Sequence, residues 1–102
     1  MQFLVIAYDG KDEGALERRM SVRPQHLENM TKVKQTGHVV CAGGIKDDAG
    51  RPIGSAMIME FPDKAVFDDY LKNEPYVVNH VWQDIKVEPI SVVVLNDEMV
   101  GK

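Results

Sequence analysis

At 102 residues the chain has the length of a single domain with a modest core. Its 44% hydrophobic and 27% charged residues are typical of a globular protein, and its net charge of −4 argues against nonspecific binding to nucleic acid or to anionic membranes. No apolar run approaches membrane-spanning length and the N-terminus lacks a signal-peptide pattern, so we expect a soluble, cytoplasmic protein.

The first half of the chain predicts a strand, a helical region and a second strand. Residues 2–8 are a short apolar run rich in strand formers, closed by Asp9-Gly10. A helical region is expected from about residue 13 to residue 36, divided in two by Pro24, because proline suits a first helical position. Gly37 suits its end, and residues 38–46 predict the second strand.

The second half predicts a hairpin, a helix and a final strand. Residues 47–52 favour a turn, and residues 53–61 form the return strand of the hairpin. Asp63 is a plausible cap for a helix that ends near residue 74, and a short helical turn should follow Pro75. Residues 84–95 predict the last strand, so we place the domain at 1–95 and a flexible C-terminal tail at 96–102.

The order β-α-β-β-α-β is that of the ferredoxin-like α+β fold, in which both helices cover one face of a four-stranded sheet. The first and last expected strands are apolar on both faces, although a sheet with one solvated face should alternate. A second copy of the same sheet is the simplest cover for the second face. We therefore expect a homodimer.

His26 is the leading candidate for chemistry. If Pro24 starts a helix, His26 lies in the first turn, where unpaired backbone amides favour the neutral imidazole that a general base needs. Asp9 is the best-placed acid to hold one ring nitrogen. The alternatives are a His26 that only packs beside an apolar stripe and an Asp9 that only forms an Asp-Gly turn.

Other positions also have two possible roles. Gly43 and Gly44 suit a ligand that approaches backbone amides, or a bulge in the hairpin. Tyr76 suits a pocket hydroxyl, or the edge of the core. Ser55 has no adjacent base and is not expected to be a nucleophile. Cys41, the single cysteine, is expected to be buried and inert, and it excludes an intrachain disulfide.

Nothing in the sequence predicts a metal ion or a cofactor. The three histidines lack the spacing of metal ligands, and the glycines fit neither a phosphate loop nor a dinucleotide fingerprint.

Several motifs together resemble the YciI-like (YCII-related) family: Ala7-Tyr8-Asp9, Arg18-Arg19, Ser21 to Leu27 (SVRPQHL), Ala42-Gly43-Gly44, Ile53-Gly54-Ser55, Glu74-Pro75-Tyr76 and Val87-Glu88-Pro89. The resemblance covers nearly the whole chain. It implies a dimeric α+β barrel and a pocket between helices and sheet with a His26–Asp9 pair. One relative in the wider family is a dehydrochlorinase of a chlorinated hydroxyquinone. Gly44 replaces an expected proline and Glu74 an expected aspartate, so the substrate does not transfer.

We therefore expect a small enzyme without a cofactor, in which His26 is the general base and Asp9 orients it. The reaction would abstract a proton beside an activating group, followed by elimination or isomerisation. Gly43, Gly44, Ser55 and Tyr76 would line the binding site for a small molecule. Arg23 would neutralise an anionic substrate oxygen, or else pair with Glu28 or Asp12. The alternative is a non-catalytic, ligand-binding or accessory domain on the same fold.

Overall fold

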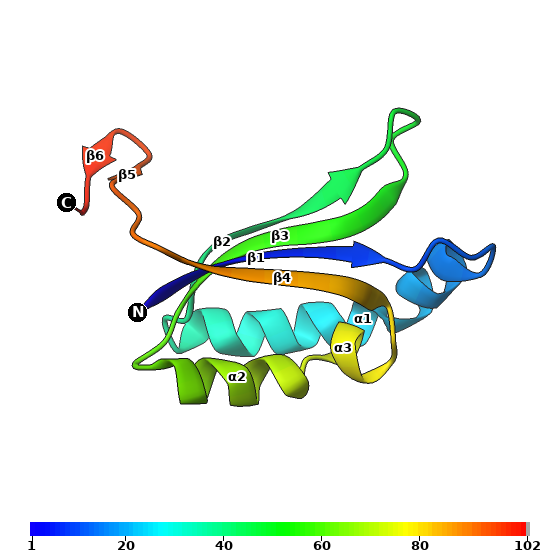
Figure 1. The fold of residues 1–102 in the computed structure, drawn as a ribbon, viewed down its shortest axis with the longest axis horizontal. Coiled ribbons are helices and arrows are strands. Elements are labelled where there is room, and N and C mark those ends of the chain that lie inside the picture. Colours follow the sequence, from blue (N-terminus) through cyan, green and yellow to red (C-terminus); the bar gives the residue numbers. More distant parts are fainter. Residues whose placement is uncertain (102) are drawn as a thin grey trace.

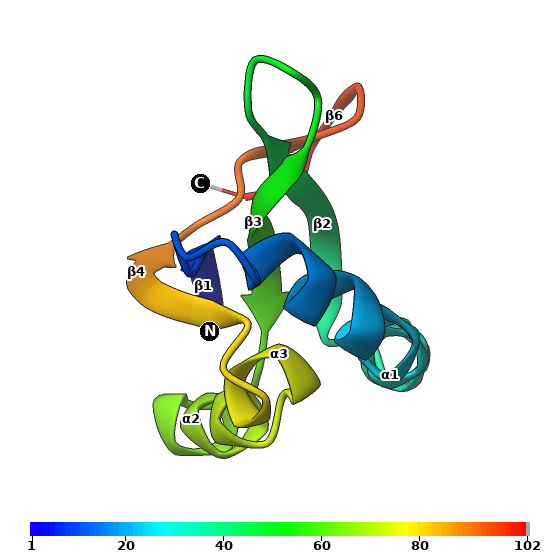
Figure 2. The same ribbon diagram turned by 90° about the vertical axis from the view of Figure 1, so that its right-hand side faces the viewer.

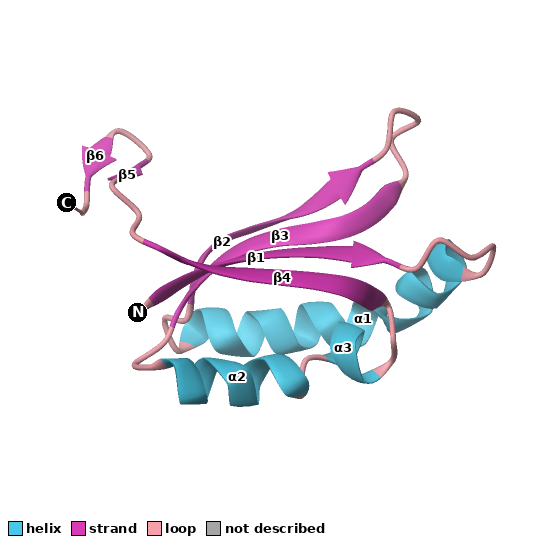
Figure 3. Ribbon diagram, viewed as in Figure 1, coloured by secondary structure: helices cyan, strands magenta, loops and turns pink. Residues whose placement is uncertain are grey.

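The computed structural model describes residues 1–101 and has one four-stranded antiparallel sheet with helices on one of its faces (Figure 1; Figure 3). The strand order is β2-β3-β1-β4. The strands are β1 (Gln2–Asp9), β2 (Val39–Lys46), β3 (Pro52–Glu60) and β4 (Trp82–Ile90), and the helices are α1 (Ala15–Gln35), α2 (Lys64–Lys72) and α3 (Pro75–Val78). This is the predicted ferredoxin-like α+β arrangement, with α3 as an added turn.

The core lies between the sheet and the helices. Along β1, Phe3, Val5 and Ala7 alternate with less buried residues and point to the helices. Phe3 stacks on Phe67 of α2 with ring centroids 4.3 Å apart. Asp63 caps α2 as expected, because its side chain accepts a hydrogen bond of 2.9 Å from the Val66 amide.

The other face of the sheet has no covering element in the described chain. Its centre is apolar and partly buried, with Leu4 and Ile6 on β1 opposite Ile58 and Ala56 on β3. The β4 margin of the same face is charged, because Asp84, Lys86 and Glu88 pair in register with Tyr8, Ile6 and Leu4. The expected two-sided apolar character therefore holds for β1 but not for β4.

Helix α1 continues through Pro24, contrary to the prediction of two helices. Figure 2 shows the first turns of α1 inclined to the rest of the helix, which is seen nearly end-on. A proline inside a helix removes one backbone hydrogen bond and commonly produces such a bend. His26 consequently lies in the middle of a helix, so the argument from an exposed helix start does not apply to it. Within residues 1–101, no helix is both long and apolar enough to span a membrane.

The C-terminal segment differs from the expected strand and tail. Strand β4 ends at Ile90, and the chain then forms a small hairpin from β5 (Val94–Leu95) and β6 (Glu98–Met99), set apart from the main sheet (Figure 1). Asn96 at its turn has a φ of 56°, which asparagine tolerates. Lys102, the last residue of the expected tail, lies outside the described residues.

Cys41 is exposed, so the prediction of a buried thiol is wrong for the single chain. The apolar run around Cys41 lies on β2, which is an edge strand. Cys41 itself pairs in register with Ile58, on the uncovered face of the sheet.

Candidate active site

A cleft of about 510 Å³ opens between α1 and the β2–β3 edge of the sheet. Several of the predicted site residues line it: Arg23, His26, Gly43, Gly44, Ser55 and Tyr76. Leu27, Met30 and Met57 add apolar surface. The sheet and the long helix therefore bring together residues that are far apart in the sequence.

The partner of His26 is Glu74, which lies at the N-cap of α3. The His26 Nδ1 atom is 2.8 Å from Glu74 Oε1, and the Glu74 side chain is fully buried. When Glu74 is a carboxylate and His26 is a neutral imidazole, Nδ1–H is the donor and the other ring nitrogen, Nε2, keeps its lone pair. The ring also stacks on Tyr76 at 3.9 Å between centroids and meets the edge of Trp82, so its orientation is held from two sides.

The expected His26–Asp9 hydrogen bond is wrong. Asp9 Oδ1 instead accepts a hydrogen bond of 2.9 Å from Arg19, about two turns before His26 on α1. Asp9 does end β1, as predicted, but its carboxylate forms an ion pair with the guanidinium of Arg19. An acid for His26 is supplied from the opposite side, by the turn that precedes Pro75.

Arg19 is a buried cation at the centre of a polar network. Its guanidinium bonds to Asp9 and donates a second hydrogen bond of 3.0 Å to Ser55 Oγ. It also lies over the Tyr76 ring, 4.9 Å from the centroid. Trp82 Nε1 donates to the same Ser55 oxygen at 3.2 Å. Four elements are thus joined around Ser55 by charged and polar side chains.

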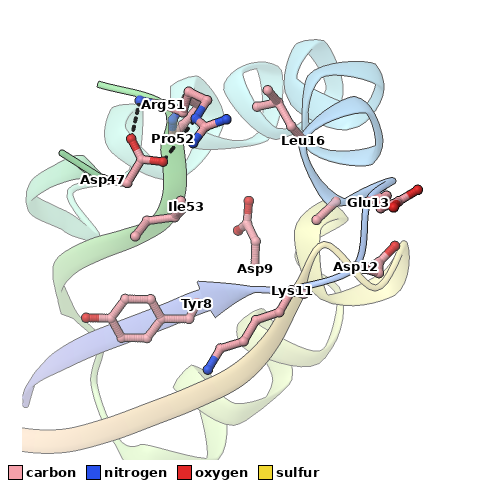
Figure 4. A pocket seen from close by; sticks show the side chains of 12 residues that line it. Tyr8, Asp9, Lys11, Asp12, Glu13, Leu16, Asp47, Arg51, Pro52 and Ile53 are labelled. Atoms are coloured by element: carbon pink, nitrogen blue, oxygen red, sulfur yellow. Dashed lines mark hydrogen bonds and ion pairs between the residues drawn. The ribbon is translucent and has the colours of Figure 1, made fainter. Parts of the chain in front are cut away.

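Asp9 also forms the inner end of a second cleft of about 430 Å³, between the start of α1 and the β2–β3 hairpin. Figure 4 shows its carboxyl group directed into the space between Leu16 and Ile53. Burial raises the pKa of Asp9 above its ordinary value near 3.8, and the charge of Arg19 opposes that rise. Asp9 Oδ2 has no hydrogen-bond partner within the described residues.

The cleft at His26 carries positive charge without a lining acid. Arg19, Arg23 and Lys46 line it, and no aspartate or glutamate among residues 1–101 does. The alternative partners of Arg23 are engaged elsewhere, since Asp12 pairs with Arg18 and Glu28 pairs with Lys32. Within residues 1–101, Arg19 is the only one of the three cations in an ion pair. Because Arg23 and Lys46 form no ion pair among the described residues, their charges favour an anion in the cleft.

The glycines and the tyrosine are placed as follows. Gly43 and Gly44 pair regularly with Ala56 and Ser55, and the irregular register of this strand pair lies elsewhere. A Cβ atom at Gly43 would meet no atom within 4 Å, so its role in approach to a ligand remains a prediction. Tyr76 is only 1% exposed and belongs to the core as well as to the cleft wall, and burial raises the pKa of its hydroxyl.

The family model of the YCII-related domain matches residues 1–91. Protein YciI of Escherichia coli O6:H1 is 30% identical over 99 residues, which cover 91% of this chain and 99% of that protein. The chain belongs to the YCII-related family.

Solved structures support the fold of this YCII-related protein. One is 5-chloro-2-hydroxyhydroquinone dehydrochlorinase of Burkholderia phenoliruptrix in complex with 2,5-dihydroxybenzoquinone, with a TM-score of 0.77, 22% identity, and coverage of 89% of this chain and 94% of that chain. Another is a dimeric ferredoxin-like protein of unknown function from Jannaschia, with a TM-score of 0.52, 15% identity, and coverage of 89% and 98%.

Arg19, Glu74 and Trp82 belong to the site of this YCII-related chain but were not among the site residues predicted from the sequence. A signal for Arg19 exists: Ala15, Arg19, Val22 and His26 have helical spacing and form the buried face of α1. A charged residue on the buried face of a helix indicates a buried site with polar partners. For Glu74 the signal is an acid directly before a helix-starting proline.

Within residues 1–101, no group of three or more His, Cys, Asp or Glu side chains is arranged to hold a metal ion.

Proposed function

We propose that this protein is a small, cofactor-independent enzyme in which His26 is the general base and Glu74, rather than Asp9, orients it. The observation that carries this proposal is the 2.8 Å contact between His26 Nδ1 and the fully buried Glu74 carboxyl group, beside a cleft that His26 lines. A buried acid on one ring nitrogen leaves the other free to take a proton from a bound molecule.

The proposed reaction starts from a carbon acid next to a carbonyl group. Nε2 of His26 takes the proton, and the electron pair of the broken C–H bond passes to the neighbouring carbonyl oxygen to give an enolate. Collapse of the enolate either expels an anion from the adjacent carbon or takes a proton at another carbon. These outcomes are elimination and isomerisation. Arg23 and Lys46 offset the negative charge of the substrate.

Hydrogen exchange in 2,5-dihydroxybenzoquinone tests this proposal without knowledge of the natural substrate. Its ring hydrogens exchange with D₂O through a tautomer that gains a deuteron at a ring carbon and then loses the original proton to a base. We expect the protein to accelerate loss of the ring signal in proton NMR spectra. His26→Gln should abolish the acceleration, and Glu74→Gln should reduce it about 10²-fold or more, because general base catalysis contributes about 10²–10⁴-fold.

Two controls separate chemistry from binding. Binding of the same quinone, followed by its absorbance, should survive in His26→Gln, and Glu74→Asp should keep part of the exchange rate. If wild-type protein binds the quinone but does not accelerate exchange, the domain is a non-catalytic ligand-binding module. Unchanged exchange in His26→Gln would exclude His26 as the base.

The proposed enzyme is a homodimer that pairs through the uncovered face of the sheet. The apolar centre of that face, formed by Leu4, Ile6, Ala56 and Ile58, supports this arrangement, because removal of such a surface from water stabilises association. The exposed thiol of Cys41 on the same face suits the reducing cytoplasm, which we propose as its location.

A further inference from the structure

Ser55 has a hydroxyl group whose direction is dictated by its two neighbours. Arg19 Nη2 is 3.0 Å from Ser55 Oγ, and Trp82 Nε1 is 3.2 Å from the same atom. A guanidinium and an indole N–H can only donate hydrogen bonds, so both contacts use lone pairs of the serine oxygen. A hydroxyl oxygen has two lone pairs and one hydrogen. Only the hydroxyl hydrogen of Ser55 remains available for a further hydrogen bond.

Within residues 1–101, the Ser55 hydroxyl donates no hydrogen bond to another group. The neighbouring acid, Asp9, is not its acceptor, since Oδ1 accepts from Arg19 and Oδ2 has no partner in the described part of the chain. Ser55 is only 4% exposed, so its unused hydrogen is costly unless something in the cleft accepts it. His26, Arg23 and Lys46 line the same cleft as Ser55.

We propose that Ser55 is a fixed, donor-only group that binds an oxyanion or carbonyl oxygen of the substrate. This inference rests on the proposed function and deepens it, because the same oxygen would gain negative charge when His26 removes the proton. The donor is already aligned, so it stabilises that charge without reorganisation during the reaction. Arg19 and Trp82 act as positioning residues through the serine oxygen.

The arrangement also defines a substrate class. A ligand group that can only donate, such as an ammonium, finds no free lone pair on Ser55 and meets positive charge from Arg23 and Lys46. Buried polar groups left unpaired in this way discriminate strongly against the wrong ligand. The substrate is therefore a molecule that presents an accepting oxygen, a carbonyl or an oxyanion, to Ser55.

The first test uses 2,5-dihydroxybenzoquinone as the probe and compares binding to wild-type protein, Ser55→Ala, Trp82→Phe and the double variant. Ser55→Ala should weaken binding about ten- to a hundredfold, the usual loss for a hydrogen bond to a charged group. Trp82→Phe frees one lone pair and lets the hydroxyl turn, so it should weaken binding severalfold. In the Ser55→Ala background the Trp82→Phe change should have no further effect. A general disturbance of the cleft would instead give independent losses, which would overturn the proposal.

The second test needs no ligand and remains informative if Ser55→Ala fails to fold. In high-resolution crystals of the unliganded protein, Ser55 Oγ should have three partners: Arg19, Trp82 and an ordered water on the cleft side. A protein acceptor for the third contact would overturn the proposal. If wild-type protein does not bind the quinone, the proposed substrate chemistry fails, while the crystal still decides the direction of the Ser55 hydroxyl.

Discussion

Replacement of Arg19 by methionine should destabilise the fold more than any change at the protein surface. The guanidinium makes an ion pair with Asp9, a hydrogen bond to Ser55 and a cation–π contact with Tyr76. Methionine keeps much of the side-chain volume but leaves both Asp9 oxygens unpaired, since Oδ2 already lacks a partner among residues 1–101. Removal of one partner of a buried ion pair costs about 3–5 kcal/mol, a large part of the total stability expected for a small domain.

The stability lost in Arg19→Met should depend on pH. Burial raises the pKa of Asp9, so the folded protein binds the proton of the Asp9 carboxyl group more tightly than the unfolded chain does. The stability that comes from Asp9 protonation is therefore complete below pH 3.8 and is lost as the pH rises from there through the folded-state pKa. Loss of Arg19 removes the charge that opposes burial and raises the pKa of Asp9 further. The stability deficit of Arg19→Met should therefore shrink as pH falls from 7 towards 5.

Urea unfolding followed by circular dichroism, at one protein concentration, measures these effects. In a double-mutant cycle, Asp9→Asn should lower the free energy of unfolding less in the Arg19→Met background than in wild-type protein, because in that background it removes a buried carboxylate that has no cation partner. Arg19→Lys is the matched control that keeps the charge but loses the planar fork. A deficit below about 1 kcal/mol, the range of exposed ion pairs, would refute the reasoning. So would a deficit that does not change with pH.

Three further predictions concern the helix and the open face. Pro24→Ala should raise the free energy of unfolding by about 1–3 kcal/mol, because it restores a helical hydrogen bond, and urea unfolding without a gain would contradict this. Ile58→Lys should shift sedimentation from dimer to monomer, whereas Lys86→Ala on the charged margin should not; equal effects would argue against the proposed interface. Cys41 should react with a thiol reagent faster as the protein is diluted, and a rate independent of concentration would mean that the proposed dimer leaves it uncovered.

The sequence was sufficient for the features that depend on local chemistry. The alternation of Phe3, Val5 and Ala7 with their neighbours reflects the period of a strand, and Asp63 caps its helix through a contact three residues away. Gly37, which has a φ of 82°, ends the long helix where glycine tolerates that conformation best. The β-α-β-β-α-β order follows from such signals, because each is decided within a few residues.

The tertiary structure alone decided which side chains meet. His26 bonds to Glu74, 48 residues away, and no local spacing could choose between Glu74 and Asp9 as its partner. The prediction that Pro24 divides the helix is wrong for a similar reason: packing of the whole α1 face against the sheet outweighs the local cost of one proline. Cys41 has an apolar neighbourhood in sequence but sits on an edge strand, and strand order is a property of the assembled sheet. Local preferences act over a few residues, whereas charge pairing and burial depend on the distances that the fold creates.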